Sequence, residues 1–185
     1  MDIANIVDKS ATIWYCPTYD IKEDTFLFNK GSDEFNKGFF CFFPSIHETN
    51  NSKEKNSITI VTGAEYKDAK YWLKNKKENL ADKLVGVAEN IIPNLSQKIE
   101  YKEIATPLTL NEYSLNYNGA VHGWESTILQ LGDPFITYRT FVDGLYLTGH
   151  WVMQKMGQGG ILTSANVGKL VARKISKDIL RKKRI

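Results

Sequence analysis

Cysteine is scarce in this sequence, which holds only Cys16 and Cys41 in 185 residues. Two thiols do not make a disulfide framework, and neither has a His or Cys at the spacing of a zinc site. Each cysteine lies in an apolar, strand-like run, so we expect both to be small buried hydrophobic side chains. The three histidines, His47, His122 and His150, lie in separate segments. The sequence therefore predicts no metal site.

Long apolar runs are also absent. No stretch approaches the ~20 apolar residues that span a bilayer, and the first residues lack the basic-then-apolar pattern of a secretory signal. We therefore expect a cytoplasmic protein, with peripheral membrane contact left open. Residues 169–185 carry eight basic residues and one acid. This basic segment either contacts anionic lipid or is a solvated helix end, and the acidic remainder of the chain speaks against nucleic-acid binding.

Motifs of nucleophilic and metal-dependent hydrolysis are missing as well. The chain has no G-x-S-x-G turn, no H-E-x-x-H helix and no carboxylate pair that can be placed on one helix face. The catalytic residues therefore stay unassigned. Such an absence is tolerable in an enzyme whose cofactor performs the chemistry, because the protein then supplies orientation and an apolar pocket.

The first half of the chain contains strand and helix signals. Residues 12–16, 39–43 and 57–62 are rich in β-branched and aromatic side chains and predict strands. A helix is expected from about Tyr66 to Asn90, because Ala69, Leu73, Leu80, Leu84, Val87 and Ile91 recur at helical spacing. Thr106-Pro107 supplies a capping hydroxyl and a proline suited to a helix start, which predicts a short helix to about Leu115.

Residues 144–185 predict a strand, a glycine-rich turn and a helix. Leu145-Tyr146-Leu147 is a short apolar run between glycines, typical of a buried strand that ends at Gly149. Gly157, Gly159 and Gly160 follow. Apolar residues then recur roughly at helical spacing, at Ile161, Leu162, Ala165, Leu170, Ala172, Ile175 and Ile179. Such a turn at a helix N-terminus suits a phosphate or an oxygen that gathers negative charge, although it could equally be a connection that binds nothing.

The last eighty or so residues resemble a known enzyme family. GLYLTGHWV at 144–152, the glycine turn and ILTSANVGKLVARKI at 161–175 look like the C-terminal flavin-binding segment of the FAD-dependent oxidoreductases that include phytoene desaturase, carotenoid isomerase and retinol saturase. Upstream, ATPLT at 105–109 and NGAVHGW at 118–124 resemble the family's Thr-Pro-x-Thr helix start and Gly-Ala-x-x-Gly stretch. The chain departs from the family at Gln154-Lys155, where Pro-Gly is usual, and at Gly159, where Pro is common.

The resemblance implies FAD as the cofactor and gives roles to individual residues. Six residues would contact the flavin, mostly through backbone groups: Gly149, His150, Gly157, Gln158, Gly160 and Ile161. Phe40, Phe42, Trp124 and Trp151 are candidates for lining a lipophilic substrate channel, although core packing would explain any one of them. The family's G-x-G-x-x-G motif, which admits the ADP pyrophosphate, is absent from this sequence.

These patterns together predict an α+β chain that resembles the C-terminal part of a larger flavoenzyme. Residues 1–105 would belong to a substrate domain with a mixed sheet and a long helix, residues 106–143 would connect, and residues 144–185 would close a Rossmann-like FAD domain. FAD binding would need the missing N-terminal half that carries G-x-G-x-x-G, either as part of a longer or split protein or as a separate polypeptide. The substrate would be a polyene or another lipophilic molecule. The alternative is a non-catalytic lipid- or protein-binding module that has lost the nucleotide-binding half.

Overall fold

The structure, a computed structural model, describes residues 12–19, 38–47, 55–72, 76–124, 136–152 and 160–182. The chain forms two compact units, Met1–Leu108 and Thr109–Ile185. Each unit has its own hydrophobic core. The predicted three-part division at residues 105 and 143 stays a prediction.

The first unit is built on a three-stranded antiparallel sheet, in which β2 (Phe39–Phe42) lies between β1 (Ile13–Tyr15) and β3 (Thr59–Val61). Cys41 stands opposite Ile13 on one side and Ile60 on the other. Because side chains alternate along a strand, Phe39 and Cys41 share one face and are fully buried, whereas Phe40 and Phe42 share the other. All three predicted strands are present, but the expected mixed sheet is wrong for the described residues, where every pairing is antiparallel.

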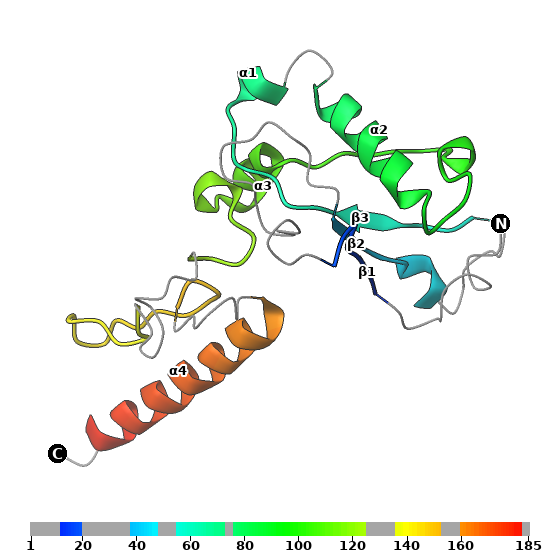
Figure 1. The fold of residues 1–185 in the computed structure, drawn as a ribbon. Coiled ribbons are helices and arrows are strands. Elements are labelled where there is room, and N and C mark those ends of the chain that lie inside the picture. Colours follow the sequence, from blue (N-terminus) through cyan, green and yellow to red (C-terminus); the bar gives the residue numbers. More distant parts are fainter. Residues whose placement is uncertain are drawn as a thin grey trace. The chain divides into compact units, whose positions relative to one another are not determined.

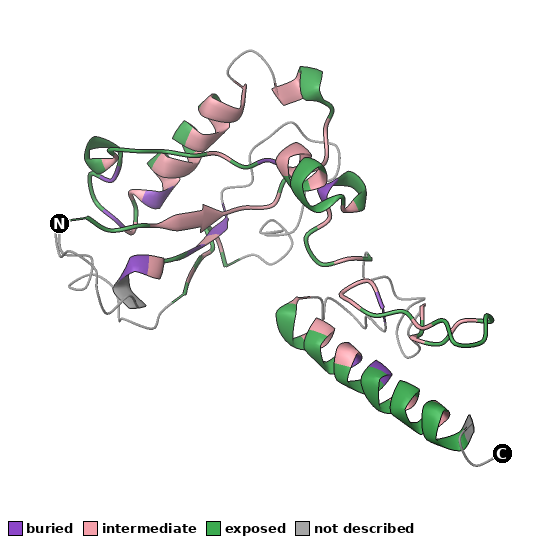
Figure 2. Ribbon diagram, turned by 180° about the vertical axis from the view of Figure 1, so that it is seen from behind, coloured by how far each residue is buried: buried purple, intermediate pink, exposed green. Residues whose placement is uncertain are grey.

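Helix α2 (Lys76–Ala88) covers the buried face of this sheet, as Figures 1 and 2 show. Ala88, Ile92 and Leu95 pack with the buried side chains of β2 and with Phe43. Leu84, Val87 and Ile91, which helical spacing places on the apolar face, are partly buried against this core. The helix expected over 66–90 is described as two helices, α1 (Ala69–Trp72) and α2, with residues 73–75 outside the described part.

Helix α3 (Pro107–Ser114) begins and ends where the Thr-Pro pattern predicts. Thr106, directly before it, is 8% exposed. Leu115 follows the helix with φ at 57°, a left-handed conformation that breaks the helical path. The fold of the described residues is therefore mixed α and β, as expected, while the Rossmann-like nature of the C-terminal part stays a prediction.

The second unit is organised around α4 (Ile161–Lys182), which confirms the predicted closing helix. Val167 and Val171 on α4 and Val152 form its small core, with Tyr138 and Tyr146 packed against them. All seven apolar positions named from helical spacing are exposed instead, as the green surface of α4 in Figure 2 illustrates. In the part of the chain that the structure describes, no helix combines the length and apolarity needed to cross a membrane.

Two predictions of burial are wrong. Leu145-Tyr146-Leu147 is not a buried strand: only Tyr146 forms a bridge, with Arg139, and Leu145 and Leu147 are exposed. A strand requires neighbours to accept and donate its backbone hydrogen bonds, and the described residues supply one such contact. Cys16 is exposed, because β1 ends one residue before it. Cys41 is buried as expected, and burial raises the pKa of its thiol.

Candidate functional site

Four of the six predicted flavin contacts are described, and all four belong to the second unit, whereas Gly157 and Gln158 lie outside the described residues. Gly149 and Gly160 have φ angles of 109° and 103°, which L-amino acids with a side chain rarely adopt. A Cβ added to either glycine would meet nothing within 4 Å. The backbone of both glycines is therefore open on the side where a Cβ would lie.

Helix α4 begins directly after Gly160 and presents an open first turn. Ile161, the last of the four described residues that were predicted to contact the flavin, is 87% exposed. Ser164 donates through both its backbone N–H (3.1 Å) and its hydroxyl (2.9 Å) to the Gly160 carbonyl oxygen. The first N–H groups of an α-helix have no partner inside the helix and carry partial positive charge. This turn therefore offers hydrogen-bond donors to an anionic or oxygen-rich group.

The segment around Gly149 packs on α4 rather than extending away from it. A Cβ on Gly168 would lie 3.8 Å from the Thr148 hydroxyl oxygen, so the chain just before Gly149 passes close to the helix backbone. Val152, three residues after Gly149, is buried against Val167 and Val171. The structure thus holds the Gly149 turn on the N-terminal half of α4.

A polar contact fastens the same segment to the C-terminal half of α4. Tyr146 donates through its hydroxyl to Asp178, which also pairs with Lys174 one turn earlier. Hydrogen bonds from Lys174 and Tyr146 lower the pKa of the Asp178 carboxyl. The hydrogen bond to Asp178 raises the pKa of Tyr146, so the phenol stays protonated. Sequence reasoning missed this contact, because nothing in the pattern of residue types marks Tyr146 and Asp178 as partners.

His150, Trp151 and Trp124 come together in the second unit. The Trp151 ring lies 5.0 Å from that of Trp124 in an edge-to-face arrangement and 5.5 Å from the imidazole of His150. The His150 Nε2 atom is buried, and no hydrogen-bond partner for it is found among the described residues. An unpaired buried polar atom costs about 1–3 kcal/mol, which a ligand's hydrogen bond would offset. One predicted cofactor contact therefore adjoins two predicted substrate contacts.

Phe40 and Phe42, the other predicted substrate contacts, belong to the first unit. Together with Trp14 they form a row of stacked aromatic rings on the sheet face opposite α2. The ring centroid of Phe40 lies 5.1 Å from that of Trp14 and 6.4 Å from that of Phe42. Trp14 is 61% exposed and Phe42 is 37% exposed. Phe40 between them is half-buried, and none of the three rings belongs to the core of the first unit.

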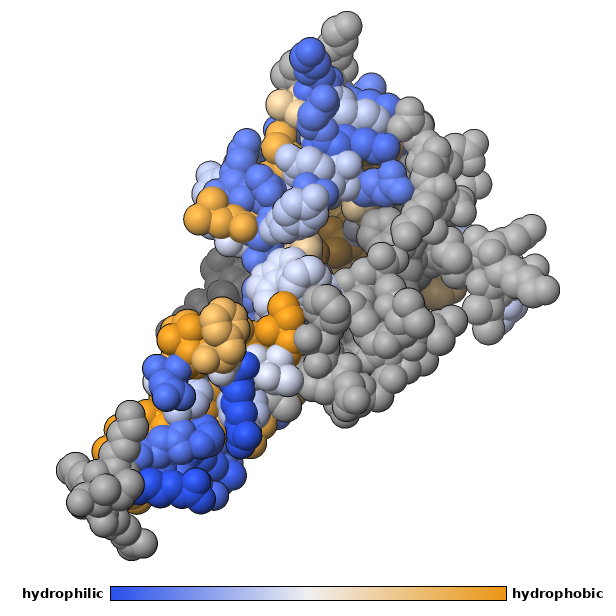
Figure 3. All heavy atoms as spheres, turned by 90° about the vertical axis from the view of Figure 1, so that its left-hand side faces the viewer, coloured by the Kyte–Doolittle hydropathy of each residue, from blue (hydrophilic) through white to orange (hydrophobic). Residues whose placement is uncertain are grey.

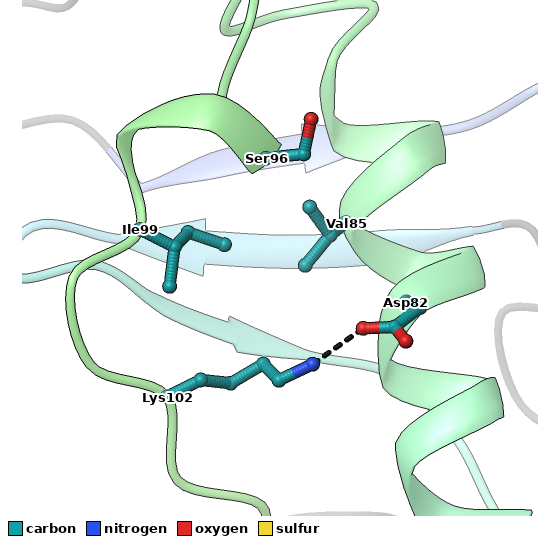
Figure 4. Close-up of a pocket in the computed structure, with 5 residues that line it drawn as sticks. All are labelled: Asp82, Val85, Ser96, Ile99 and Lys102. Carbon is teal, nitrogen blue, oxygen red and sulfur yellow. Dashed lines mark hydrogen bonds and ion pairs between the residues drawn. The ribbon is translucent and has the colours of Figure 1, made fainter.

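A surface groove in the first unit offers less room than a lipophilic ligand needs. Asp82, Val85, Ser96, Ile99 and Lys102 line it, and its volume is about 250 Å³. Small-molecule pockets usually have about 300–1,000 Å³. Figure 4 shows Lys102 and Asp82 directed toward each other as an ion pair. We therefore do not assign the groove to the substrate.

Metal chemistry finds no support in the described ranges, where no group of three or more His, Cys, Asp or Glu side chains could hold an ion. This result concerns only those residues.

Comparison with known proteins gives one informative similarity. The chain is 28% identical to all-trans-retinol 13,14-reductase of Danio rerio over an alignment of 125 residues, which covers 60% of this chain. The match spans only 20% of that protein's own length. No protein-family model matches the chain, and no solved structure matches it. The chain is thus distantly similar to a retinol reductase, in agreement with the resemblance of the sequence motifs.

Proposed function

We propose that this chain supplies the C-terminal part of a flavin-dependent oxidoreductase that transfers hydride to or from a polyene or other lipophilic substrate. FAD binding would require the half that carries G-x-G-x-x-G, which this sequence does not contain; a separate polypeptide that carries it is one way to supply it. The similarity to all-trans-retinol 13,14-reductase is the observation that carries this proposal. The phytoene desaturase-like motifs in residues 105–124 and 144–175 point to the same family.

The described residues fit a flavin in three respects. Gly149 and Gly160 leave the backbone open to close approach, the first turn of α4 offers free N–H donors, and His150 has a buried Nε2 without a partner among the described residues. FAD, when bound, supplies the hydride chemistry. His150 would hydrogen-bond the ribityl chain or a phosphate, and the N-terminus of α4 would stabilise negative charge on the ring.

The need for a partner polypeptide is supported by apolar surface on the second unit. Ile161, Ala165, Ala172, Ile175 and Ile179 recur at steps of three, four or seven and are all exposed, so one side of α4 is an apolar stripe. Leu145 and Leu147 are exposed as well. In the view of Figure 3, hydrophobic and strongly hydrophilic side chains lie next to each other on the unit that contains α4. A row of exposed apolar side chains along a helix is typical of an interaction site.

A partner polypeptide accounts for this surface better than a membrane does. Small residues such as Ala165 and Ala172 allow the backbone of a neighbouring element to approach closely, whereas interfacial helices rely on bulky apolar side chains. The strand-like run around Tyr146 also lacks, among the described residues, the neighbours that a sheet in the partner would provide. Binding of α4 to anionic lipid is the competing explanation of the apolar stripe, and it is tested by measuring binding to anionic vesicles.

The substrate class follows from apolar and aromatic surface. The Trp124–Trp151 pair lies directly beside His150, where a conjugated chain could pack against aromatic rings. The rival function is a non-catalytic module that binds a lipid or another protein through the same aromatic surfaces. It is distinguished by the absence of flavin binding under every condition.

The experiment that tests the substrate class uses all-trans-retinol as the probe. The chain, assembled with a polypeptide carrying G-x-G-x-x-G and loaded with FAD, is reduced anaerobically and mixed with retinol. We expect flavin reoxidation and loss of the polyene absorption in equal amounts. Trp124→Ala should raise KM a few-fold to about tenfold, the effect of losing one aromatic contact.

Tyr113→Ala is the matched control, because Tyr113 is 87% exposed on α3 and lies outside the proposed channel. A flavin-loaded assembly that leaves retinol and longer polyenes unchanged would contradict the polyene assignment while leaving the flavin assignment intact.

A further inference from the structure

Asn116 connects the two motifs that resemble the flavoenzyme family. Its side-chain oxygen Oδ1 accepts a hydrogen bond from the indole Nε1 of Trp151 at 3.1 Å. Its amide Nδ2 donates to the Ala120 carbonyl oxygen at 2.9 Å. Ala120 belongs to the Gly119–Gly123 stretch, and Trp151 follows the Gly149 turn, so one side chain joins segments more than thirty residues apart in the sequence.

Trp151 is held from a second direction by Trp124. The Nε1 of Trp124 donates to the Trp151 carbonyl oxygen at 3.0 Å, and the two rings meet edge to face. Asn116 therefore fixes the ring of Trp151, and Trp124 fixes its backbone. A residue that is hydrogen-bonded through both its ring and its backbone has few alternative rotamers, and this is how surrounding residues orient a functional group.

The ring of Trp151, restrained in this way, packs against the imidazole of His150. The imidazole lies against it with a centroid distance of 5.5 Å and an angle of 40° between the rings. Since Nε2 is buried and lacks a partner among the described residues, the direction in which it points depends on packing rather than on a hydrogen bond of its own. If the Trp151 ring rotated, the imidazole would lose this packing contact.

We propose that Asn116 is a positioning residue of the flavin site, which acts through Trp151 to direct His150 Nε2 beside the Gly149 turn. This role rests on the proposed function. It assigns a task to the Gly119–Gly123 stretch as well, because Ala120 anchors Asn116. Asn116 itself need not touch the cofactor.

The test compares three variants by NMR of the complete chain and by FAD titration of the assembled protein. Asn116→Leu removes both hydrogen bonds, Asn116→Asp keeps an acceptor for Trp151, and Asn166→Ala is a control on the exposed surface of α4. We expect Asn116→Leu to shift the Trp151 indole N–H and His150 imidazole signals and to weaken FAD binding about fivefold, the effect of one ordinary hydrogen bond. Asn116→Asp should keep an acceptor for the Trp151 indole N–H but lose the donor to the Ala120 carbonyl, so its Trp151 and His150 signals should shift less than those of Asn116→Leu. Asn166→Ala should change neither readout.

The outcomes separate this role from the proposed function. Unchanged Trp151 and His150 signals in Asn116→Leu, or equal FAD affinity of this variant and the wild type, would overturn the role of Asn116 alone. No FAD binding by the wild-type assembly would overturn both. If Asn116→Leu fails to fold, Trp151→Phe keeps an aromatic ring while removing the N–H donor and part of the ring surface, so the His150 signal and the FAD titration of that variant decide.

Discussion

Replacing Gly160 by valine is expected to weaken FAD binding by the assembled protein at least about fivefold, because valine at this backbone conformation is strained by about 1–3 kcal/mol. Gly160 has φ at 103° and directly precedes α4. A branched side chain there would also occupy the open space beside the backbone, where an added Cβ meets no other atom within 4 Å. The measurement is a titration of the assembled protein with FAD, followed by flavin fluorescence.

Gly86→Ala is the matched control for this substitution. Gly86 lies within α2, its φ is not positive, and an added Cβ would meet nothing within 4 Å. Alanine in a helix interior stabilises by about 0.5–1 kcal/mol relative to glycine, so the control should fold at least as well as the wild type and bind FAD equally. Equal FAD affinity of Gly160→Val and Gly86→Ala would contradict the placement of the cofactor at the N-terminus of α4.

Replacing Phe39 by alanine is expected to cost about 3–5 kcal/mol of unfolding free energy, as for other buried aromatic side chains. Phe39 has no exposed surface, stacks on Tyr15 at 5.1 Å and belongs to the core between the sheet and α2. The loss combines the transfer free energy of the ring with the cavity left behind. Because natural domains are stable by only about 5–15 kcal/mol, a large share of the first unit's stability should disappear.

Phe42→Ala supplies the comparison within the same strand. Phe42 is 37% exposed on the opposite face of the sheet and contacts Phe40 at 6.4 Å, so its loss should cost about 1 kcal/mol. Urea unfolding monitored by circular dichroism measures both changes. Similar losses for the two variants would mean that burial does not distinguish the two faces of the sheet.

The sequence predicts those helices and strands that are determined by residues close to them in the chain. Proline after a capping hydroxyl places the start of α3, and a continuous run of aromatic residues places β2, since both depend on neighbours within a few positions. The exposure of Cys16 does not follow from such patterns, because it depends on β1 ending at Tyr15. That end is set by pairing with β2 and not by the residue types alone.

The candidate site could be predicted in part. The glycines at 149 and 160 are assigned from their places around the predicted strand and helix, and both have positive φ. Asn116 is not marked by the sequence, because its role depends on Trp151 and Ala120 lying on either side of it in space. Seven apolar positions on α4 form a recognisable helical pattern, but their exposure could not be predicted, because an apolar stripe has the same spacing whether it faces its own core or a partner.

The measurement that tests the proposed function most directly is a visible absorption spectrum of the wild-type chain after incubation with FAD and removal of free cofactor. It is recorded for the chain alone and again after assembly with a polypeptide that carries G-x-G-x-x-G. We expect a colourless chain alone and a bound flavin spectrum only in the assembly. Stoichiometric flavin on the chain alone would contradict the need for a partner, and no flavin under either condition would contradict the oxidoreductase and favour a non-catalytic binding module.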